Sequence, residues 1–183
     1  MRIIAGKNKS RILNTLEGLN TRPMTDRMKE SVFNCIGPYF DGDKVLDLFG
    51  GSGALSLESL SRGASHAWIC EKSYDAIKVI KGNISSLKEE SNTTVMNTDY
   101  QVALNRLALE GKKFDIIFLD PPYKLNIMDE LVEFLVNNKM LNEDAVIICQ
   151  YVKGNYSPKE YNELYVKKNY NYGVSEVTIY QMK

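Results

Sequence analysis

Residues 44–54 read Lys44-Val45-Leu46-Asp47-Leu48-Phe49-Gly50-Gly51-Ser52-Gly53-Ala54, a short apolar run that passes into closely spaced glycines. Apolar residues then recur at helical spacing over residues 54–60, so this stretch predicts a strand, a tight turn and a helix. Glycines at such a turn let the backbone approach a ligand and leave the N–H groups of the helix start free. We therefore expect a nucleoside-type ligand to bind where this strand ends.

The rest of the chain alternates in the same way between short apolar segments and amphipathic ones. We expect helices over residues 26–36, 54–60, 75–87, 102–109 and 127–136. We expect strands over residues 44–49, 67–70, 94–97, 114–119, 145–149, 163–168 and 175–181. No helix fits between the last two strands, so they must run antiparallel. The pattern predicts an α/β fold with a mostly parallel seven-stranded sheet, covered on both faces, and a C-terminal antiparallel hairpin.

The chain has 183 residues and a mass of 20.8 kDa, which suits one domain. We expect residues 1–183 to form a single domain, with residues 1–22 as a basic hairpin or arm outside the main core and residues 23–183 as the α/β core. Hydrophobic residues make up 44% and charged residues 25%, as in ordinary globular proteins. No apolar run approaches the ~18–20 residues of a membrane span, and the start lacks a secretory apolar region. We therefore expect a cytoplasmic protein.

Basic side chains concentrate near the N-terminus, although Lys plus Arg and Asp plus Glu are equal at 23 each. The first 30 residues carry seven basic and three acidic side chains, a net charge of +4, and the rest of the chain carries −4. A basic segment on an acidic body indicates contact with a phosphate backbone, and the alternative is that these charges serve solubility. The side chains expected to make such contact are Lys7, Lys9 and Arg11.

Residues that bind metals or do redox chemistry are sparse. The chain has three cysteines (Cys35, Cys70 and Cys149) without a Cys-x-x-Cys pair, and one histidine, His66. A zinc site or a Cys–His catalytic pair therefore lacks its parts, and we expect no metal site. Buried, reduced thiols are the simpler interpretation of the cysteines.

The residues around the glycine turn indicate which nucleoside ligand binds there. Glu71 follows Gly51 by 20 residues, at the end of the next predicted strand, where a carboxylate can bind a ribose diol. The dinucleotide fingerprint requires a further glycine where this chain has Ser56. Asp47, just before the turn, suits a ligand with an amino group and no phosphate, such as S-adenosylmethionine. Asp99 ends the third predicted strand, where it can bond the adenine amino group or cap the next helix, and these interpretations are compatible.

The tetrapeptide Asp120-Pro121-Pro122-Tyr123 follows the most hydrophobic predicted strand, at the edge where open α/β sheets bind ligands. A base amino group is a poor nucleophile because its lone pair is delocalised into the ring. If the Asp120 carboxylate and the Pro121 carbonyl accept its N–H bonds, that pair localises and the nitrogen can attack a sulfonium methyl. The prolines fix the turn, and Tyr123 offers a face for an extruded base. The alternative, a proline-rich turn with a chance aspartate, explains this combination poorly.

These two motifs resemble those of class I S-adenosylmethionine-dependent methyltransferases that modify exocyclic amino groups. Further stretches are similar to the RsmD family, which methylates the guanine 2-amino group in bacterial 16S ribosomal RNA. The matching stretches are residues 1–4 with 6–7, 22–23 with 25–27, 47–49 with 51–55, 60–64, and 114–115 with 120–123. The resemblance implies a Rossmann-like class I methyltransferase fold with S-adenosylmethionine as cofactor. It also implies a partner, 16S ribosomal RNA in the small subunit or an assembly intermediate, and we expect a monomer.

The resemblance also assigns roles to residues. Those that would contact the cofactor are Phe49, Gly51, Gly53, Glu71 and Asp99, together with Asp47 from the reasoning above. Those that would hold the target base are Asp120, Pro121 and Tyr123, with Pro122 beside them. Those that would form a lid are Arg22, Asp26 and Arg27, although charge in the first turn of a helix is the alternative for the last two. The chain departs from the family pattern at Ala5, Ser10, Gly50 and Cys149-Gln150, which affects the expected substrate contacts but not the reaction.

Three other functions fit parts of the sequence. A DNA adenine or cytosine amino-methyltransferase shares the tetrapeptide but normally carries a separate target-recognition region, and here 60 residues follow Tyr123. A nicotinamide-dependent oxidoreductase needs a phosphate-compatible turn and an acid–base residue, which Ser56 and His66 do not supply. A binding module without turnover is the third alternative, and the intact tetrapeptide argues against it.

Overall fold

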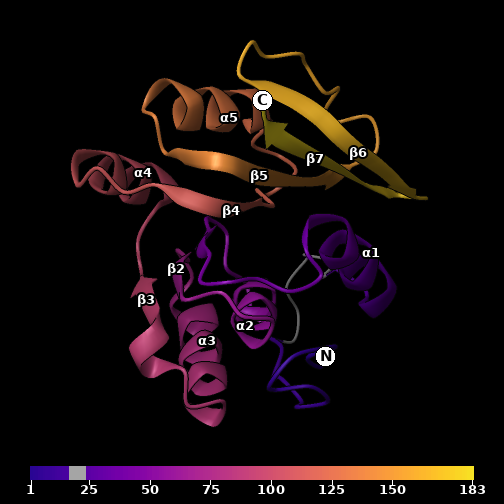
Figure 1. Ribbon diagram of the computed structural model, residues 1–183. Coiled ribbons are helices and arrows are strands. Elements are labelled where there is room, and N and C mark those ends of the chain that lie inside the picture. The colour runs from indigo at the N-terminus through magenta and orange to yellow at the C-terminus, as the bar shows by residue number, and fades with distance from the viewer. Residues whose placement is uncertain (17–23) are drawn as a thin grey trace.

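The computed structural model of the chain describes residues 1–16 and 24–183 (Figure 1). In chain order these form α1 (Asp26–Ile36), β1 (Lys44–Asp47), α2 (Ala54–Ser61), β2 (His66–Cys70), α3 (Tyr74–Ser86), the 3-10 turn η1 (Glu90–Asn92), β3 (Thr93–Met96), α4 (Tyr100–Leu109), β4 (Phe114–Leu119), α5 (Met128–Asn137), β5 (Leu141–Val152), β6 (Leu164–Tyr172) and β7 (Ser175–Met182). Every helix and strand that the sequence predicts is present. None of the described helices is long and apolar enough to cross a membrane.

The strands form one sheet of seven in the order β3-β2-β1-β4-β5-β7-β6. The strands from β1 to β5 pair in parallel, whereas β7 pairs antiparallel with both β5 and β6. The prediction of a mostly parallel sheet with a C-terminal antiparallel hairpin is therefore confirmed. The direction of strand addition reverses between β1 and β4, and open α/β sheets bind their ligands at the carboxyl ends of strands beside such a point.

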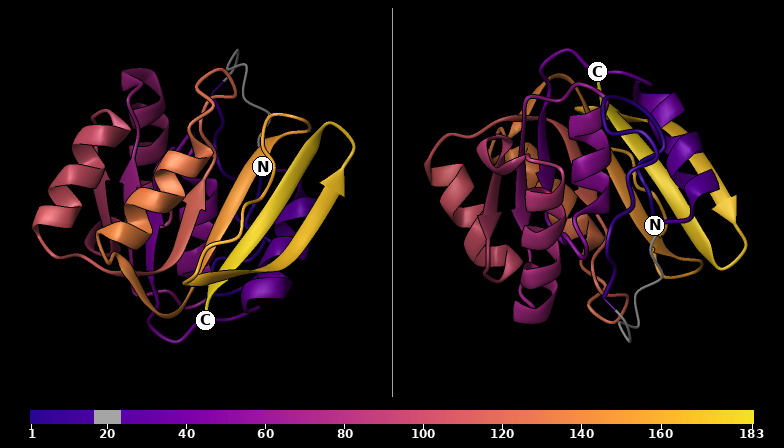
Figure 2. Two further views of the ribbon diagram at one scale, coloured as in Figure 1. Left: turned by 90° about the horizontal axis from the view of Figure 1, so that it is seen from above. Right: turned by 90° about the horizontal axis from the view of Figure 1, so that it is seen from below.

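Helices cover both faces of the sheet, as the two views of Figure 2 show. On one face lie α1, α2 and α3, and on the other lie α4 and α5. The alternation of side chains along β4 supplies both layers, because Ile116 and Phe118 belong to the first buried cluster and Ile117 and Leu119 to the second. A continuously apolar strand such as β4 is therefore buried on both sides, as its sequence predicts.

The N-terminal segment packs on the core. An antiparallel bridge pairs Arg2 with Ile12, which makes a hairpin, as expected. However, Ile3 and Leu13 are 1% and 2% exposed and belong to the buried cluster beneath α1, α2 and α3. The expectation of an arm outside the main core is therefore wrong for the described part of this segment, because Ile3 and Leu13 turn inward, although Ile12 stays 76% exposed. Residues 17–22 of the expected arm lie outside the described residues.

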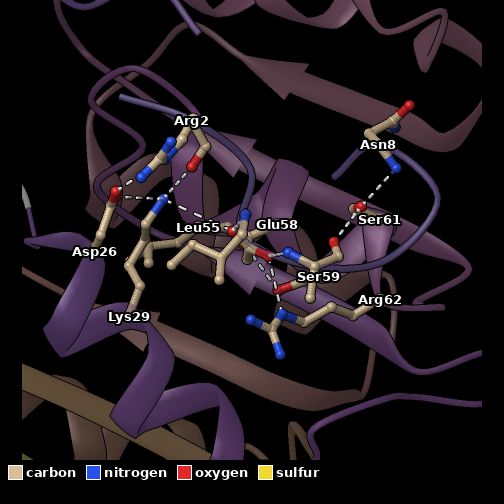
Figure 3. Close-up of polar contacts among 11 residues, drawn as sticks. Arg2, Asn8, Asp26, Lys29, Leu55, Glu58, Ser59, Ser61 and Arg62 are labelled. Carbon is tan, nitrogen blue, oxygen red and sulfur yellow. Dashed lines mark hydrogen bonds and ion pairs between the residues drawn. The ribbon is translucent and has the colours of Figure 1, made fainter. Parts of the chain in front are cut away.

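A buried carboxylate fastens this hairpin to the helices (Figure 3). Glu58 of α2 accepts hydrogen bonds from the backbone N–H groups of Ile4 at 2.9 Å and Ala5 at 3.2 Å. Its side chain also accepts a hydrogen bond from Arg62 Nε at 2.9 Å, and Lys29 Nζ of α1 lies 3.7 Å from Glu58 Oε1. The side chains of Glu58 and Lys29 are completely buried. Because a buried charge is tolerated only when it is paired, Glu58 ties the hairpin, α1 and α2 to one another.

The bounds of β5 and β6 differ most from those predicted. β5 extends beyond the expected residues 145–149 at both ends. Residues 169–172, expected as part of a connection, continue β6 and pair with the first residues of β7. β6 is the edge strand of the sheet, and most of its side chains are exposed. An exposed edge strand tolerates polar residues, so its sequence lacks the apolar signal that identifies the central strands.

Candidate active site

The carboxyl ends of the parallel strands open into a cavity of about 780 Å³, called the larger cavity below. This volume suits a nucleoside-sized ligand. Five of the six residues expected to bind the cofactor line it, namely Asp47, Phe49, Gly51, Glu71 and Asp99. The sixth, Gly53, begins α2 as its N-cap. The structure therefore brings together residues that are up to 52 positions apart in the sequence.

The glycine turn connects β1 to α2 at the wall of the larger cavity. Gly51 and Gly53 adopt the left-handed conformation, with φ of 59° and 82°. A Cβ at Gly51 would meet no atom within 4 Å, so the backbone here borders open space where a ligand can lie against it. At Gly50, in contrast, a Cβ would lie 2.5 Å from Ile69 Cγ2. The departure from the family pattern at Gly50 is therefore matched by close packing against β2.

Glu71, at the end of β2, is held in place by two backbone donors. Its Oε2 accepts a hydrogen bond from Gly51 N at 2.9 Å and its Oε1 from Ser73 N at 3.0 Å. Each carboxylate oxygen has a second lone pair, so Glu71 keeps the capacity to accept from a diol in the cavity. The same carboxylate fixes the glycine turn relative to β2, a role that the sequence does not reveal.

Asp47 ends β1 beneath the glycine turn and is 3% exposed. Ser56 Oγ donates a hydrogen bond to Asp47 Oδ2 at 3.1 Å. Ser56 occupies the position at which the dinucleotide fingerprint requires glycine. The residue that argues against a dinucleotide site is therefore also the hydrogen-bond partner of Asp47. Burial, and to a lesser extent the charge of Glu71, raises the pKa of Asp47 to about 7. No described basic residue forms an ion pair with Asp47, so a cationic ligand group would find an unpaired acid here.

Asp99 and an aromatic pair form another part of the wall. Asp99 Oδ1 accepts a hydrogen bond from Gln101 N at 2.9 Å, so Asp99 caps α4, as one interpretation of the sequence predicts. Phe49 and Tyr100 line the cavity with ring centroids 5.4 Å apart. Sequence reasoning missed Tyr100, although its position directly after Asp99 is a usable signal. The two rings offer an apolar surface for a purine.

A smaller cavity of about 550 Å³ adjoins the larger one and contains the tetrapeptide. All four residues of Asp120-Pro121-Pro122-Tyr123 line it, and Asp120 and Pro122 also line the larger cavity. Tyr123 is 55% exposed, with Lys124 Nζ 6.0 Å from its ring centroid. An aromatic face at the mouth of the smaller cavity suits a base that stacks as it enters.

Asp120 stands where the two cavities meet. Burial, together with the charge of Asp47, raises the pKa of Asp120 to about 7. A carboxyl with a pKa near 7 changes its charge close to neutral pH, and such groups concentrate at functional sites. Asp120 is therefore a titratable hydrogen-bond acceptor between the larger cavity, which has the size of a nucleoside, and the smaller cavity, which Tyr123 lines.

The basic and lid residues that the structure describes, Lys7, Lys9, Arg11, Asp26 and Arg27, line neither cavity. Lys7 Nζ forms an ion pair with Glu89 at 2.6 Å, and Arg11 Nη2 donates to Ser86 O at 2.8 Å. Asp26 Oδ2 lies 3.4 Å from Arg2 Nε in the first turn of α1. The exposed side chains of this group are Lys7, Lys9, Arg11, Asp26 and Arg27. Arg22 lies outside the described residues.

Sequence reasoning assigned no role in the site to several other residues of the cavity walls, among them Lys29, Cys70 and Gln150, although it noted Gln150 as a departure from the family pattern. Lys29 and Cys70 line the larger cavity, and Gln150 lines both. Lys29 stands on the apolar face of α1, and Gln150 is the last buried residue of β5, so a polar residue at a buried position was the available signal for both. Within the described part of the chain, no three His, Cys, Asp or Glu side chains gather as a metal site.

Comparison with known proteins gives consistent matches over the chain. The family model described as conserved hypothetical protein 95 matches residues 1–181. The putative rRNA methyltransferase YlbH of Bacillus subtilis (strain 168) is 39% identical over 183 residues, covering 100% of both chains. Ribosomal RNA small subunit methyltransferase D of Escherichia coli (strain K12) is 35% identical over 150 residues, covering 82% of this chain and 74% of that protein. The solved structure of the putative methyltransferase yhhF from Escherichia coli has a TM-score of 0.86 and 32% identity, covering 100% of this chain and 98% of that one.

These matches include both motifs that the sequence singles out. The family model spans the glycine turn and the tetrapeptide, and the yhhF structure shares the fold over the whole chain. The expected class I methyltransferase fold is therefore confirmed, and with it the resemblance on which the expectation rested. The chain belongs to the RsmD family of S-adenosylmethionine-dependent class I methyltransferases, whose family model is described as conserved hypothetical protein 95.

Proposed function

We propose that the protein transfers a methyl group from S-adenosylmethionine to the 2-amino group of a guanine in 16S ribosomal RNA. The observation that carries this proposal is the position of Asp120, which lies between two adjoining cavities and belongs to the wall of both. The similarity to ribosomal RNA small subunit methyltransferase D of Escherichia coli supports the choice of substrate.

The larger cavity fits S-adenosylmethionine. Glu71 would accept the ribose hydroxyls, and the unpaired acid of Asp47 would receive the amino group of the methionine portion. Phe49 and Tyr100 would contact the purine, and the carboxylate oxygen of Asp99 that does not cap α4 would accept its amino group. When bound, S-adenosylmethionine supplies an electrophilic methyl group on a positively charged sulfur.

The tetrapeptide would hold the target base in the smaller cavity. The Asp120 carboxylate and the Pro121 carbonyl would each accept one N–H of the guanine amino group, which localises the nitrogen lone pair for attack. Proline at 121 and 122 leaves no backbone N–H to compete for these acceptors. Tyr123 would stack on the extruded base, which offsets part of the few kcal/mol that unstacking costs. Catalysis then depends mainly on positioning and electrostatics, with the surplus proton of the methylated nitrogen passing to Asp120 or to solvent.

The proposed partner is 16S ribosomal RNA within the small ribosomal subunit or an assembly intermediate. A small enzyme suits a substrate whose folded shape presents the target base. The exposed side chains of Lys9 and Arg27 would contact phosphates without first breaking an ion pair to a described residue, unlike Lys7, which pairs with Glu89. We propose further that the enzyme acts in the cytoplasm, as a monomer and without a metal ion.

The test is methyl transfer from labelled S-adenosylmethionine to three acceptors: unmodified small subunits, deproteinised ribosomal RNA and duplex DNA. We expect label in the small subunits with the wild-type protein and none with Asp120→Ala. Calorimetry should show that Asp120→Ala still binds S-adenosylhomocysteine, which separates lost chemistry from lost folding. Label in DNA alone would assign the protein to the DNA amino-methyltransferases and overturn the proposal.

A further inference from the structure

The end of β5 holds a buried amide without a described partner. Gln150 is 6% exposed and lines both the larger and the smaller cavity. Among the described residues, the polar side-chain atoms that are sealed from solvent and lack a hydrogen bond are Asn8 Nδ2 and Tyr172 Oη. The amide of Gln150 is not one of them and forms no side-chain hydrogen bond within the described chain, so it reaches the open space of the cavities. A ligand that fills the cavities would remove this amide from solvent, and an amide left without a partner then costs about 1–3 kcal/mol, so the ligand is expected to bond it.

Gln150 is the neighbour of Asp120 across the sheet. The parallel register of β4 and β5 pairs Leu119 with Cys149, so Asp120 and Gln150 are the next residues along the two strands. Neighbouring strands lie about 4.8 Å apart, which is comparable to the distance between the two outer groups of the guanine edge, the 2-amino nitrogen and the 6-oxygen. A base whose amino group binds Asp120 therefore extends its adjacent edge toward the end of β5.

Guanine carries its 2-amino group, its N1–H and its 6-oxygen in succession along that edge. An amide offers one acceptor oxygen and two donor hydrogens. Oε1 can therefore accept from N1–H while Nε2 donates to the 6-oxygen. Adenine presents the opposite order, an acceptor at N1 and a donor at its 6-amino group, so an amide held in this orientation rejects it.

We propose that Gln150 is a specificity-determining residue that reads the N1–H and 6-oxygen of the target guanine. The proposal rests on the proposed function, because it takes the guanine 2-amino group as the group that Asp120 holds. In this proposal, the N1–H and 6-oxygen edge of the guanine faces Gln150 of β5, a residue that belongs to neither the glycine turn nor the tetrapeptide.

The test uses reconstituted small subunits with either guanine or 2-aminopurine at the methylated position, mapped first with the wild-type enzyme. 2-Aminopurine keeps the amino group but lacks N1–H and the 6-oxygen. We expect wild-type kcat/KM to fall roughly 10–100-fold on 2-aminopurine, the value of one bidentate base contact. Gln150→Leu should show a similar fall on guanine and no further fall on 2-aminopurine. Gln150→Glu, which keeps an acceptor for N1–H, should lose less than Gln150→Leu.

The matched control is Gln181→Leu, the same substitution on β7. The Gln181 amide bonds Tyr165 and the Asp144 carbonyl and lines neither cavity, so kcat/KM should match the wild-type value on both substrates. Affinity for S-adenosylhomocysteine should be the same in all four proteins, which shows that each folds.

Three results would overturn the inference. Unchanged kcat/KM of Gln150→Leu on guanine would show that the amide does not touch the base. If kcat/KM of Gln150→Leu falls on 2-aminopurine relative to guanine as far as that of the wild type does, another group reads the edge of the base. If Gln150→Leu loses affinity for S-adenosylhomocysteine as much as it loses kcat/KM, Gln150 acts in the larger cavity instead. If the wild-type enzyme leaves guanine unmethylated, the proposed function fails as well, and the wild-type reaction alone reveals this.

Discussion

Asp120, the first residue after β4, lies on the wall of the same cavity as Asp47, which ends the neighbouring strand β1. Burial is the main cause that raises the pKa of each carboxyl to about 7, and the charge of Asp47 raises that of Asp120 further. The site therefore gains negative charge as the pH rises through neutrality. A ligand with a positively charged sulfur and an amino group relieves that repulsion, whereas a pyrophosphate increases it.

The pair predicts how stability depends on pH. Free aspartate ionises near pH 3.9, whereas these two carboxyls have a pKa of about 7 when folded. Between these values the folded protein binds more protons than the unfolded chain, so their contribution to stability falls as pH rises and levels off above about 7. Asp47→Asn removes one acid and its effect on Asp120. Urea unfolding should therefore show the variant gaining stability relative to wild type between pH 5 and pH 7.5.

The control for this measurement is Asp75→Asn, a change at an exposed acid in the first turn of α3. Its stability relative to wild type should be nearly the same at both pH values. If Asp47→Asn also shows no relative gain, the two carboxyls do not share the buried environment that the structure describes.

Substitution of Gly51 should weaken ligand binding beyond what its effect on stability explains. Gly51→Ala puts a methyl group into the open space of the larger cavity, in a left-handed conformation that costs about 1–2 kcal/mol. Gly42→Ala carries a similar strain at φ of 81°, also with no atom near the added methyl, but Gly42 lines neither cavity. Calorimetry should show at least a tenfold loss of S-adenosylhomocysteine affinity for Gly51→Ala alone, about 1.4 kcal/mol. Equal affinities of the two variants would contradict a ligand lying against the glycine turn.

Replacing Glu58, which lines neither cavity, should cause a large loss of stability. Glu58→Gln leaves Arg62 and Lys29 without their shared carboxylate in a buried site, and breaking such a pair costs about 3–5 kcal/mol. Glu133→Gln makes the same change on the exposed face of α5 and should alter stability by less than about 0.5 kcal/mol. Denaturant unfolding measures both, and equal stabilities of the two variants would contradict the role of Glu58 as the attachment of the hairpin.

The two lysines of the basic hairpin, Lys7 and Lys9, should differ in how their substitution affects RNA binding and stability. Lys9 is exposed, so Lys9→Met should lower the slope of log affinity for 16S ribosomal RNA against log salt by about 1 and leave stability unchanged. Lys7→Met should weaken RNA binding and stability together, because Glu89 is 3% exposed and loses its ion-pair partner. Fluorescence anisotropy at several salt concentrations measures the slopes. An unchanged slope for Lys9→Met would contradict contact with the RNA phosphates and would support the alternative that these charges serve solubility.

The sheet was predictable because each central strand carries its own apolar signal. The sequence of β4 is buried on both faces, and the stripe of α3 shows the side that packs on the sheet. The packing of the hairpin was not predictable, because Ile3 and Leu13 are single apolar residues among basic ones. The length of β6 was also hidden, since an edge strand with exposed side chains needs no apolar pattern.

Local motifs predicted part of the site, and long-range contacts completed it. The glycine turn, Glu71 and the tetrapeptide are recognisable because each follows a strand at its carboxyl end. Gln150 and Lys29 reach the cavities only through the pairing of β5 with β4 and the packing of α1. A single sequence shows that such residues are polar and near buried segments, but it does not show which cavity they reach.

The most direct test of the account is the chemical identity of the methylated nucleoside. Small subunits treated with wild-type protein and S-adenosylmethionine are digested to nucleosides and analysed by mass spectrometry against standards, with Asp120→Ala as the matched reaction. The account predicts 2-methylguanosine with the wild-type protein and none with Asp120→Ala. A methyl group on any other atom or base, or undiminished 2-methylguanosine with Asp120→Ala, would contradict it.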